Sequence, residues 1–259
     1  MSTIKNIPMF LWLKQYIIEN GYNVGHGLFS IGHIAWLIVI IVISMIVSKY
    51  YKNANENKRQ NVRKICAILI FLLEFIKIAI IGFLYPSYMN EYIPLHICSV
   101  AGMCIMFDAL IPNKKIINSL EPYVFLSSAI IAVLTPSSTY PYFNFFNIHT
   151  FIYHGILIIY AACKISSKES KIEYSGIWNS MLLLLIMVFP IYYINKYFHS
   201  NYMMISDPSD FAVAKVIWNA ITPKFGHIGY IAFLGLICLL VFHIIYVIGK
   251  VKKKNKKCR

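Results

Sequence analysis

The sequence predicts an all-α, polytopic membrane protein, a bundle of about seven transmembrane helices. Apolar residues make up 59% of the 259 residues and aromatic residues 15%, which is too apolar for an ordinary soluble domain of this length. Runs of about 20 mainly apolar residues, the length that crosses a bilayer as a helix, recur along nearly the whole chain. Basic residues also gather in alternate linkers between these runs. These observations predict a multi-pass protein of the cell membrane.

Seven apolar runs are long enough to be spans, and short linkers join them. They cover roughly residues 28–49, 64–85, 93–112, 117–136, 142–163, 177–197 and 226–249. The chain then divides into an N-terminal segment (1–27), a seven-helix domain (28–249) and a basic tail (250–259). Too little polar sequence remains for a nucleotide-binding module.

The N-terminal segment lacks the pattern of a secretory signal. Lys14 interrupts the apolar run from Ile7 to Leu13, and no small-residue cleavage site follows. Apolar residues alternate there with Lys5, Lys14 and Glu19, a mixture that suits a helix lying in the membrane interface.

The net charge of +14 is distributed in a way that favours a membrane protein over a nucleic-acid-binding one. Of the 24 basic residues, 18 lie after the first, third and fifth runs or in the tail. By the positive-inside rule, this pattern predicts an N-terminus outside and a C-terminus inside, as an odd number of spans requires. We expect the tail to contact anionic lipid, and we expect no nucleic acid partner.

Two charged residues are predicted near the middle of the second span. Glu74 and Lys77 are three residues apart and therefore share one helical face. Because an ionisable group in hydrocarbon is costly, such a residue is a functional hypothesis by default. A neutralising ion pair, a proton relay and a substrate anchor all fit this spacing.

The histidines gather on the predicted outer side. Seven of the eight belong to outer halves of spans or to outer segments: His26, His33, His96, His149, His154, His199 and His227. Any one of them alone fits an ordinary core or interface histidine. Their grouping predicts a shared polar pocket open to the outer leaflet.

We expect no metal and no cofactor in this pocket. His149 and His154 are five residues apart, about 140° around a helix, so they do not share a face as two ligands would. The six cysteines also lack the spacing of a zinc site. Asp108 and Glu121 are predicted at the inner ends of their spans, where they would form a solvated or capping cluster beside Lys114 and Lys115.

His96 and Cys98 cannot form a catalytic pair by themselves. They are two residues apart, about 200° around a helix, and point in nearly opposite directions. Only another span can supply Cys98 with a base, and His154 and His33 are at a suitable depth. A thiol needs an imidazole or a cation nearby to become a thiolate in apolar surroundings. Without such a partner, Cys98 would be a packing residue.

Short motifs in a fixed order resemble a known family. They are Gly32-His33, Leu95-His96-Ile97-Cys98 after Pro94, Leu134-Thr135-Pro136, Phe143-Asn144-Phe145-Phe146 before Phe151-Ile152-Tyr153-His154-Gly155, and Asn201-Tyr202-Met203. The chain resembles, over roughly residues 29–248, the YwaF-like bacterial membrane proteins, which are grouped with the eukaryotic transmembrane protein 164 acyltransferases. Two positions depart from the pattern: Ser99 stands where bacterial members often have an acid, and Leu95 where the eukaryotic pattern has its cysteine.

The resemblance implies a seven-helix transacylase that moves a fatty acyl chain between phospholipids through an acyl-thioester. Cys98 would be the nucleophile and His154 the general base, with His96 and Asn201 as pocket or oxyanion groups. The partners would be membrane phospholipids or their acyl chains. The alternative is a non-catalytic protein that binds or transports a lipid or small molecule, with Glu74, Lys77 and outer histidines such as His33 and His149 as its headgroup pocket.

Overall fold

A computed structural model describes residues 7–208 and 212–257 of the chain. Helices account for most of these residues, and the described part contains no strand. The prediction of an all-α fold is therefore confirmed. Residues 1–6 of the predicted interfacial segment and residues 258–259 of the predicted tail lie outside the described residues.

The described chain forms long helices joined by shorter ones. The long helices are α2 (Ile31–Asn53), α3 (Glu56–Leu84), α7 (Phe145–Ser166), α8 (Tyr174–Phe198) and α9 (Ala212–Lys257). The shorter ones are α1 (Lys14–Glu19), α4 (Ile97–Leu110), α5 (Lys115–Leu120) and α6 (Leu126–Leu134). A π-helical turn over Glu121–Phe125 joins α5 to α6. Three-residue to six-residue 3-10 turns lie at Met9–Leu11, Pro86–Glu91 and Tyr202–Met204.

Six helical segments in the described residues are long and apolar enough to cross a membrane, with α5, the π turn and α6 acting as one. The predicted third span, 93–112, is helical only over the 14 residues of α4. At 1.5 Å per residue, α4 extends about 21 Å, less than the roughly 30 Å hydrocarbon core. Pro94 and an extended backbone at His96 delay the start of this helix. The prediction of about seven spans is close, and the difference lies in this segment.

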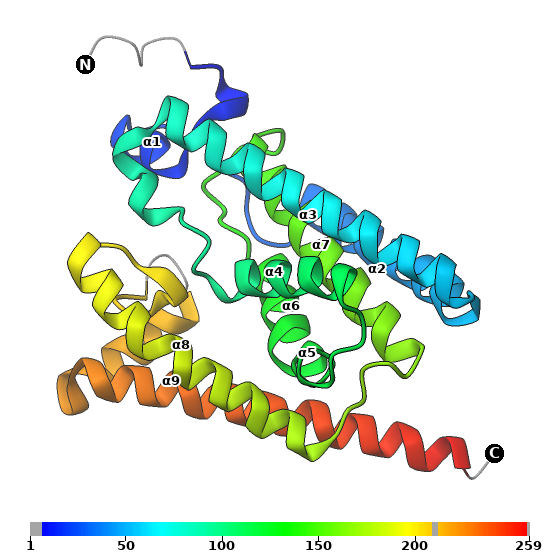
Figure 1. The fold of residues 1–259 in the computed structure, drawn as a ribbon. Helices are drawn as coiled ribbons and strands as arrows, with labels where there is room; N and C mark the ends of the chain where they lie inside the picture. The colour runs from blue at the N-terminus through cyan, green and yellow to red at the C-terminus, as the bar shows by residue number, and fades with distance from the viewer. Residues whose placement is uncertain (1–6, 209–211, 258–259) are drawn as a thin grey trace.

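The helices form two groups with α4, α5 and α6 between them (Figure 1). On one side, α7 packs against α2 and α3, and it also contacts α4 and α6. On the other side, α8 crosses α9. Because α7 contacts so many elements, its side chains meet groups from across the molecule.

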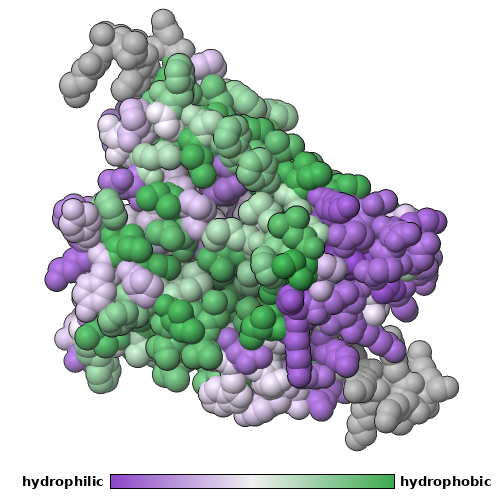
Figure 2. Space-filling view, viewed as in Figure 1, coloured by the Kyte–Doolittle hydropathy of each residue, from purple (hydrophilic) through white to green (hydrophobic). Residues whose placement is uncertain are grey.

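On the face shown in Figure 2, apolar residues cover much of the surface, and hydrophilic residues gather mainly at one end. Large apolar side chains such as Ile41, Phe71 and Leu185 are exposed on the long helices, as lipid contact requires. The hydrophilic end coincides with the turn between α2 and α3 and with the end of α9 (Figures 1 and 2). The basic linkers therefore meet at one end of the molecule, in keeping with the predicted orientation.

The N-terminal segment packs onto the end of the bundle far from these basic linkers. Leu13 and Ile17 are fully buried against Ile81, Tyr85 and other apolar side chains. The hydroxyl of Tyr85 accepts from the amide of Leu13 at 3.2 Å. The helix in this segment is only the six residues of α1. An interfacial role for the apolar residues that remain exposed stays a prediction.

Helix α9 is broken at Gly226. Its backbone there has φ of 66° and ψ of −172°, values that no helix continues and that glycine adopts without a side-chain clash. The predicted last span, 226–249, begins at this break. The segment that is long and apolar enough to cross a membrane runs from Ala214 to Val251, so it also includes the helix before the break.

Candidate cysteine–histidine site

Cys98 lies in the first turn of α4, which begins at Ile97. Tyr202, in the loop after α8, holds the chain just before this helix through two hydrogen bonds. The amide of Ile93 donates to the Tyr202 hydroxyl at 3.0 Å, and that hydroxyl donates to the carbonyl of Asn90. Burial raises the pKa of Tyr202 to about 12, so it stays protonated as a donor. The first turn of a helix carries partial positive charge, which stabilises an anion placed there.

The imidazole of His154 faces the thiol of Cys98. Their side chains are hydrogen-bonded, and the hydroxyl of Ser128 from α6 also reaches the sulfur. The Nδ1 of His154 lies 2.7 Å from the carbonyl oxygen of Thr150. Since a carbonyl only accepts, Nδ1 carries the proton and Nε2 keeps a lone pair for the thiol proton. The structure thus brings together the nucleophile and base suggested by the sequence.

Both side chains are half-buried; His154 lies on α7, which is long and apolar enough to cross a membrane, and Cys98 lies on the shorter apolar helix α4. A fully enclosed thiol would be closed to a lipid, and a fully exposed one would lose its imidazole partner to competing contacts. A half-buried pair keeps the two side chains in contact with each other and leaves part of their surface accessible.

A charged pair from α3 lies beside this thiol and imidazole. The Nζ of Lys77 is 2.6 Å from Oε1 of Glu74, and both side chains are mostly buried. Lys77 also interacts electrostatically with His96, His149 and His154. The ion pair, one of the three alternatives that the sequence left open, is therefore present, and it borders the same site.

Two buried atoms near this pair have no hydrogen-bond partner among the described residues. They are Oε2 of Glu74 and Nε2 of His149. The imidazole of His149 stacks on the ring of Tyr153, with centroids 5.3 Å apart. Buried polar atoms are nearly always satisfied in native proteins, by protein, water or ligand. These two atoms are therefore available to a bound polar group.

His96 is the residue before α4 and has an extended backbone, so the helical arithmetic from the sequence does not describe its position relative to Cys98. Its Nδ1 accepts from the amide of Met203 at 3.3 Å, and its ring meets the Tyr202 ring edge-on with centroids 5.2 Å apart. Its side chain is exposed. His96 therefore borders the rim of the site next to the loop after α8.

In the structure, His33 and Asn201 form hydrogen bonds with the backbone of other parts of the chain. His33 joins α2 to α6, because its Nδ1 accepts from the amide of Phe29 at 2.9 Å and its Nε2 pairs with the carbonyl of Val133 at 2.8 Å. Asn201 closes its own loop, since its amide group donates to the carbonyl of Asp207 at 3.0 Å. A direct role for either residue in substrate binding stays a prediction.

Sequence reasoning missed three groups that complete the site. Thr150 orients the imidazole through its carbonyl, Ser128 reaches the sulfur, and the Tyr153 hydroxyl is 3.4 Å from the carbonyl of Cys98. The spacing of four residues between Thr150 and His154 could have indicated this contact, because residues four apart are neighbours on a helix. Nothing in the sequence indicates that Ser128 would face α4.

The close packing of α4 on α7 rests on a glycine. A Cβ on Gly102 would lie 2.3 Å from the hydroxyl oxygen of Tyr153 and 2.9 Å from a methyl carbon of Ile70. We expect Gly102→Ala to destabilise the protein by about 1–3 kcal/mol, as overpacking does. Thermal unfolding in detergent, followed by tryptophan fluorescence, measures this loss. Gly235→Ala is the matched control, because a Cβ there meets nothing within 4 Å; equal transitions in the two variants would contradict the close contact.

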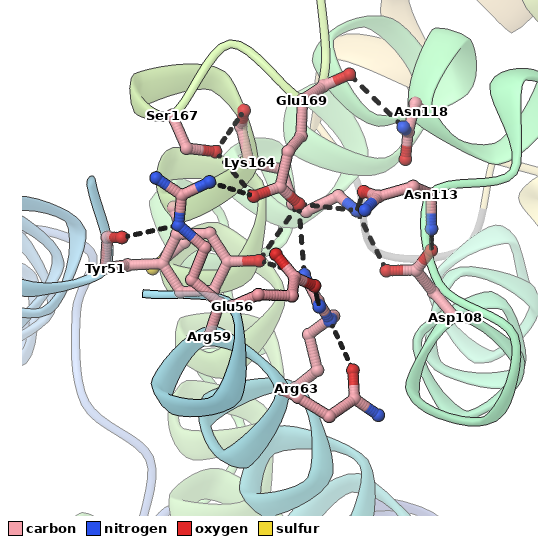
Figure 3. Close-up of polar contacts among 12 residues, drawn as sticks. Tyr51, Glu56, Arg59, Arg63, Asp108, Asn113, Asn118, Lys164, Ser167 and Glu169 are labelled. Atoms are coloured by element: carbon pink, nitrogen blue, oxygen red, sulfur yellow. Dashed lines mark hydrogen bonds and ion pairs between the residues drawn. The ribbon is translucent and has the colours of Figure 1, made fainter. Parts of the chain in front are cut away.

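A second polar cluster lies at the basic end of the bundle and corrects one prediction (Figure 3). Asp108 and Glu121 were expected to form a solvated or capping cluster beside Lys114 and Lys115, but they are 0% and 2% exposed. The solvated alternative is wrong because α7 and the following loop cover both carboxylates. Capping holds for Asp108, whose Oδ1 accepts from the backbone amide of Asn113 at 2.8 Å. The Nζ of Lys164 lies 2.9 Å from Asp108, and Ser170 donates to Glu121.

Glu169 links this cluster to α3. Its carboxylate pairs with Arg59 at 3.2 Å, with Arg63 at 3.2 Å and with Lys164 at 3.1 Å. Arg63 and Lys164 are both fully buried. We call Arg59, Arg63, Asp108, Lys164 and Glu169 the inner ion network (Figure 3).

The fold and the site together define a multi-pass helical membrane protein with a thiol–imidazole pair within its apolar bundle. The chain belongs to the TMEM164 family, whose family model matches residues 28–246. This match confirms the suspected relation to transmembrane protein 164. No curated protein and no solved structure matches the chain.

Proposed function

We propose that the protein is a cysteine-dependent acyltransferase that moves fatty acyl chains between phospholipids of the cell membrane. The observation that carries this proposal is the Cys98–His154 hydrogen bond, with the imidazole oriented by the carbonyl of Thr150. A nucleophile, a base and a group that orients the base are the parts that thiol acyl transfer requires.

The first half-reaction would load the enzyme. Nε2 of His154 takes the thiol proton, and the Cys98 sulfur attacks the ester carbonyl carbon of the donor phospholipid. The carbon–oxygen bond to the lysolipid breaks, and the leaving oxygen receives the proton from Nε2. The products are an acyl-thioester on Cys98 and a lysolipid.

The second half-reaction would reverse these roles. The hydroxyl of an acceptor lysolipid gives its proton to Nε2 of His154 and attacks the thioester carbonyl. The carbon–sulfur bond breaks, and the thiol recovers its proton from Nε2. First-turn amides of α4, which lack intrahelical acceptors, are suited to stabilise the oxyanion in both steps.

The remaining predicted residues would hold the headgroup. Lys77, His96 and His149 offer cationic or hydrogen-bonding groups for a phosphate, and Glu74 keeps Lys77 in place. His33 and Asn201 would support this pocket from α2 and from the loop after α8.

An acyl-trapping experiment tests the proposal. Purified full-length protein is incubated with a phospholipid whose acyl chain carries a radiolabel, and the label on the protein is counted before and after hydroxylamine. We expect label that hydroxylamine removes, absent from Cys98→Ala and retained in Cys238→Ala, which alters a half-buried thiol on α9. An unlabelled wild type, or equal labelling of Cys98→Ala, would reject the assignment.

Binding or transport without catalysis is the second candidate function. It is favoured by the unpaired buried atoms of Glu74 and His149 beside Lys77. In that case Cys98→Ala would behave as the wild type in every lipid assay.

Lys77→Gln is expected to weaken phospholipid binding about tenfold, because a charge-assisted hydrogen bond contributes about 1.5–3 kcal/mol. Quenching of a fluorescent phospholipid by the protein measures the affinity. Lys196→Gln serves as the control, because Lys196 is exposed at the end of α8. Equal affinities in the two variants would remove Lys77 from the headgroup pocket.

The basic tail and the location of the protein also belong to this proposal. The tail would contact anionic lipid on the inner leaflet, where each basic residue contributes about 1 kcal/mol. We propose no nucleic acid partner, because the basic residues follow the membrane topology. Multi-pass membrane insertion rests on the apolar helices, and the plasma membrane is the proposed compartment.

A further inference from the structure

A cavity of about 600 Å³ opens at the basic end of the molecule, away from the cysteine–histidine site. Its walls come from α5 and Asn113 just before it, the loop between α7 and α8, and the start of α8. Its volume lies within the range of small-molecule sites, about 300–1,000 Å³. Among the described lining residues, all except Ile116 are of polar or charged types.

Two lysines in the cavity wall lack a carboxylate partner within the described chain. Lys115 and Lys171 both line the cavity and are exposed, and neither forms an ion pair among the described residues. Glu169 also lines the cavity, but Arg59, Arg63 and Lys164 already neutralise it. The carboxylate of Glu169 therefore does not balance the two ammonium groups, and Glu173 supplies the other carboxylate of the wall.

Uncharged donors accompany these lysines. The hydroxyl of Ser175 lies in the wall at the start of α8. Glu173, the residue before α8, makes no capping hydrogen bond with its side chain. The amide of Gly176 donates to the backbone carbonyl of Glu173 at 3.0 Å, which leaves the two amides before it, those of Tyr174 and Ser175, without a side-chain cap. Helix N-terminal amides and ammonium groups together are the usual ligands of a phosphate.

The cavity also contains a buried acceptor without a partner. Asn118 is 9% exposed, and its Nδ2 donates to the backbone carbonyl of Glu169 at 3.2 Å, which fixes the orientation of the amide. Its Oδ1 is buried and unpaired. The carboxylate of Glu173 is a second acceptor in the wall that forms no described ion pair. A ligand that satisfies this wall carries both a phosphate and a hydrogen-bond donor.

We propose that this cavity binds a phosphate ester whose alcohol part carries a hydrogen-bond donor, a glycerophosphate-type group, with Lys115 and Lys171 on the phosphate and Asn118 on the donor. Such a group could belong to a lipid headgroup of the nearby leaflet or to a soluble phosphate ester. The site is separate from the acyl-transfer proposal, because none of its residues contacts Cys98 or His154 in the described structure.

Binding of two probes to full-length protein in uncharged maltoside micelles tests this site. Glycerol 3-phosphate is titrated by calorimetry, and retention of phosphatidylglycerol over phosphatidylcholine is counted by native mass spectrometry. The test variant is Lys115→Ala/Lys171→Ala. The matched control is Lys64→Ala/Lys168→Ala, which removes two exposed lysines outside the cavity wall.

We expect the test variant to lose at least about tenfold in affinity for a bound probe, and the control to keep the wild-type value. Retention of phosphatidylglycerol identifies a lipid headgroup as the source, whereas binding of glycerol 3-phosphate alone identifies a soluble ester. The proposal is overturned if the wild type binds neither probe, or if the test and control variants lose affinity equally. Cys98→Ala should bind as the wild type, so this test and the acyl-trapping test fail independently.

Discussion

His154→Gln is expected to form the acyl-thioester at least about 100-fold more slowly than the wild type, since a positioned general base contributes about 10²–10⁴-fold. Glutamine keeps a polar side chain of similar reach, but it cannot take a proton from the thiol at neutral pH. The imidazole is held for this task, because Nδ1 is fixed on the carbonyl of Thr150 and Nε2 meets the thiol of Cys98.

The rate of label incorporation from a radiolabelled phospholipid, over a time course, measures this effect. His243→Gln is the matched control. Its Nδ1 also pairs with the carbonyl four residues before it, that of Leu239 at 2.8 Å, but it lies on α9. Both variants lose the same intrahelical contact, and only His154 faces the thiol. Equal rates in the two variants would show that the imidazole of His154 is not the base.

Lys164→Met is expected to lower the free energy of unfolding by about 3–5 kcal/mol, the usual cost of removing one partner of a buried ion pair. The ammonium of Lys164 is fully buried and contacts Asp108 at 2.9 Å, Asn113 at 3.0 Å and Glu169 at 3.1 Å (Figure 3). Methionine fills a similar volume but leaves the carboxylate of Asp108 buried without its cation.

Unfolding in a graded mixture of detergent and dodecyl sulfate, followed by tryptophan fluorescence, gives this free energy. Lys168→Met is the control, because Lys168 is exposed four residues later. The double variant Lys164→Met/Asp108→Asn should recover part of the loss, since it leaves no uncompensated charge at that position. A loss no greater than that of Lys168→Met would show that the inner ion network contributes little to stability.

The fold class could be predicted from local properties of the chain, whereas the pairing of Cys98 with His154 was implied by the family resemblance. Apolar length predicted most of the spans, and the predicted run 226–249 begins at the break in α9. Predicted depth narrowed the base of Cys98 to His154 or His33. These results depend only on residues close in sequence, and periodicity carries that information.

The sequence predicted that polar side chains lie within the membrane-spanning bundle, but not which of these side chains contact one another. His33 and His154 are both outer histidines, yet His33 is occupied by the amide of Phe29 and the carbonyl of Val133. Asp108 sat at a predicted helix end, where solvent exposure was the reasonable expectation. Burial there depends on α7 and its following loop, more than 50 residues away in sequence.

The sequence by itself determined that this protein is a helical membrane protein and which polar residues lie near the thiol's depth. Only the tertiary structure decided that α4 is a short helix, that Ser128 and Thr150 complete the site, and that the inner ion network is buried beside a polar cavity. The physical reason is that hydrophobic length and helical period are local, whereas contacts between side chains depend on which helices pack together. That packing is set by close approaches such as Gly102 against Tyr153, which no local pattern reveals.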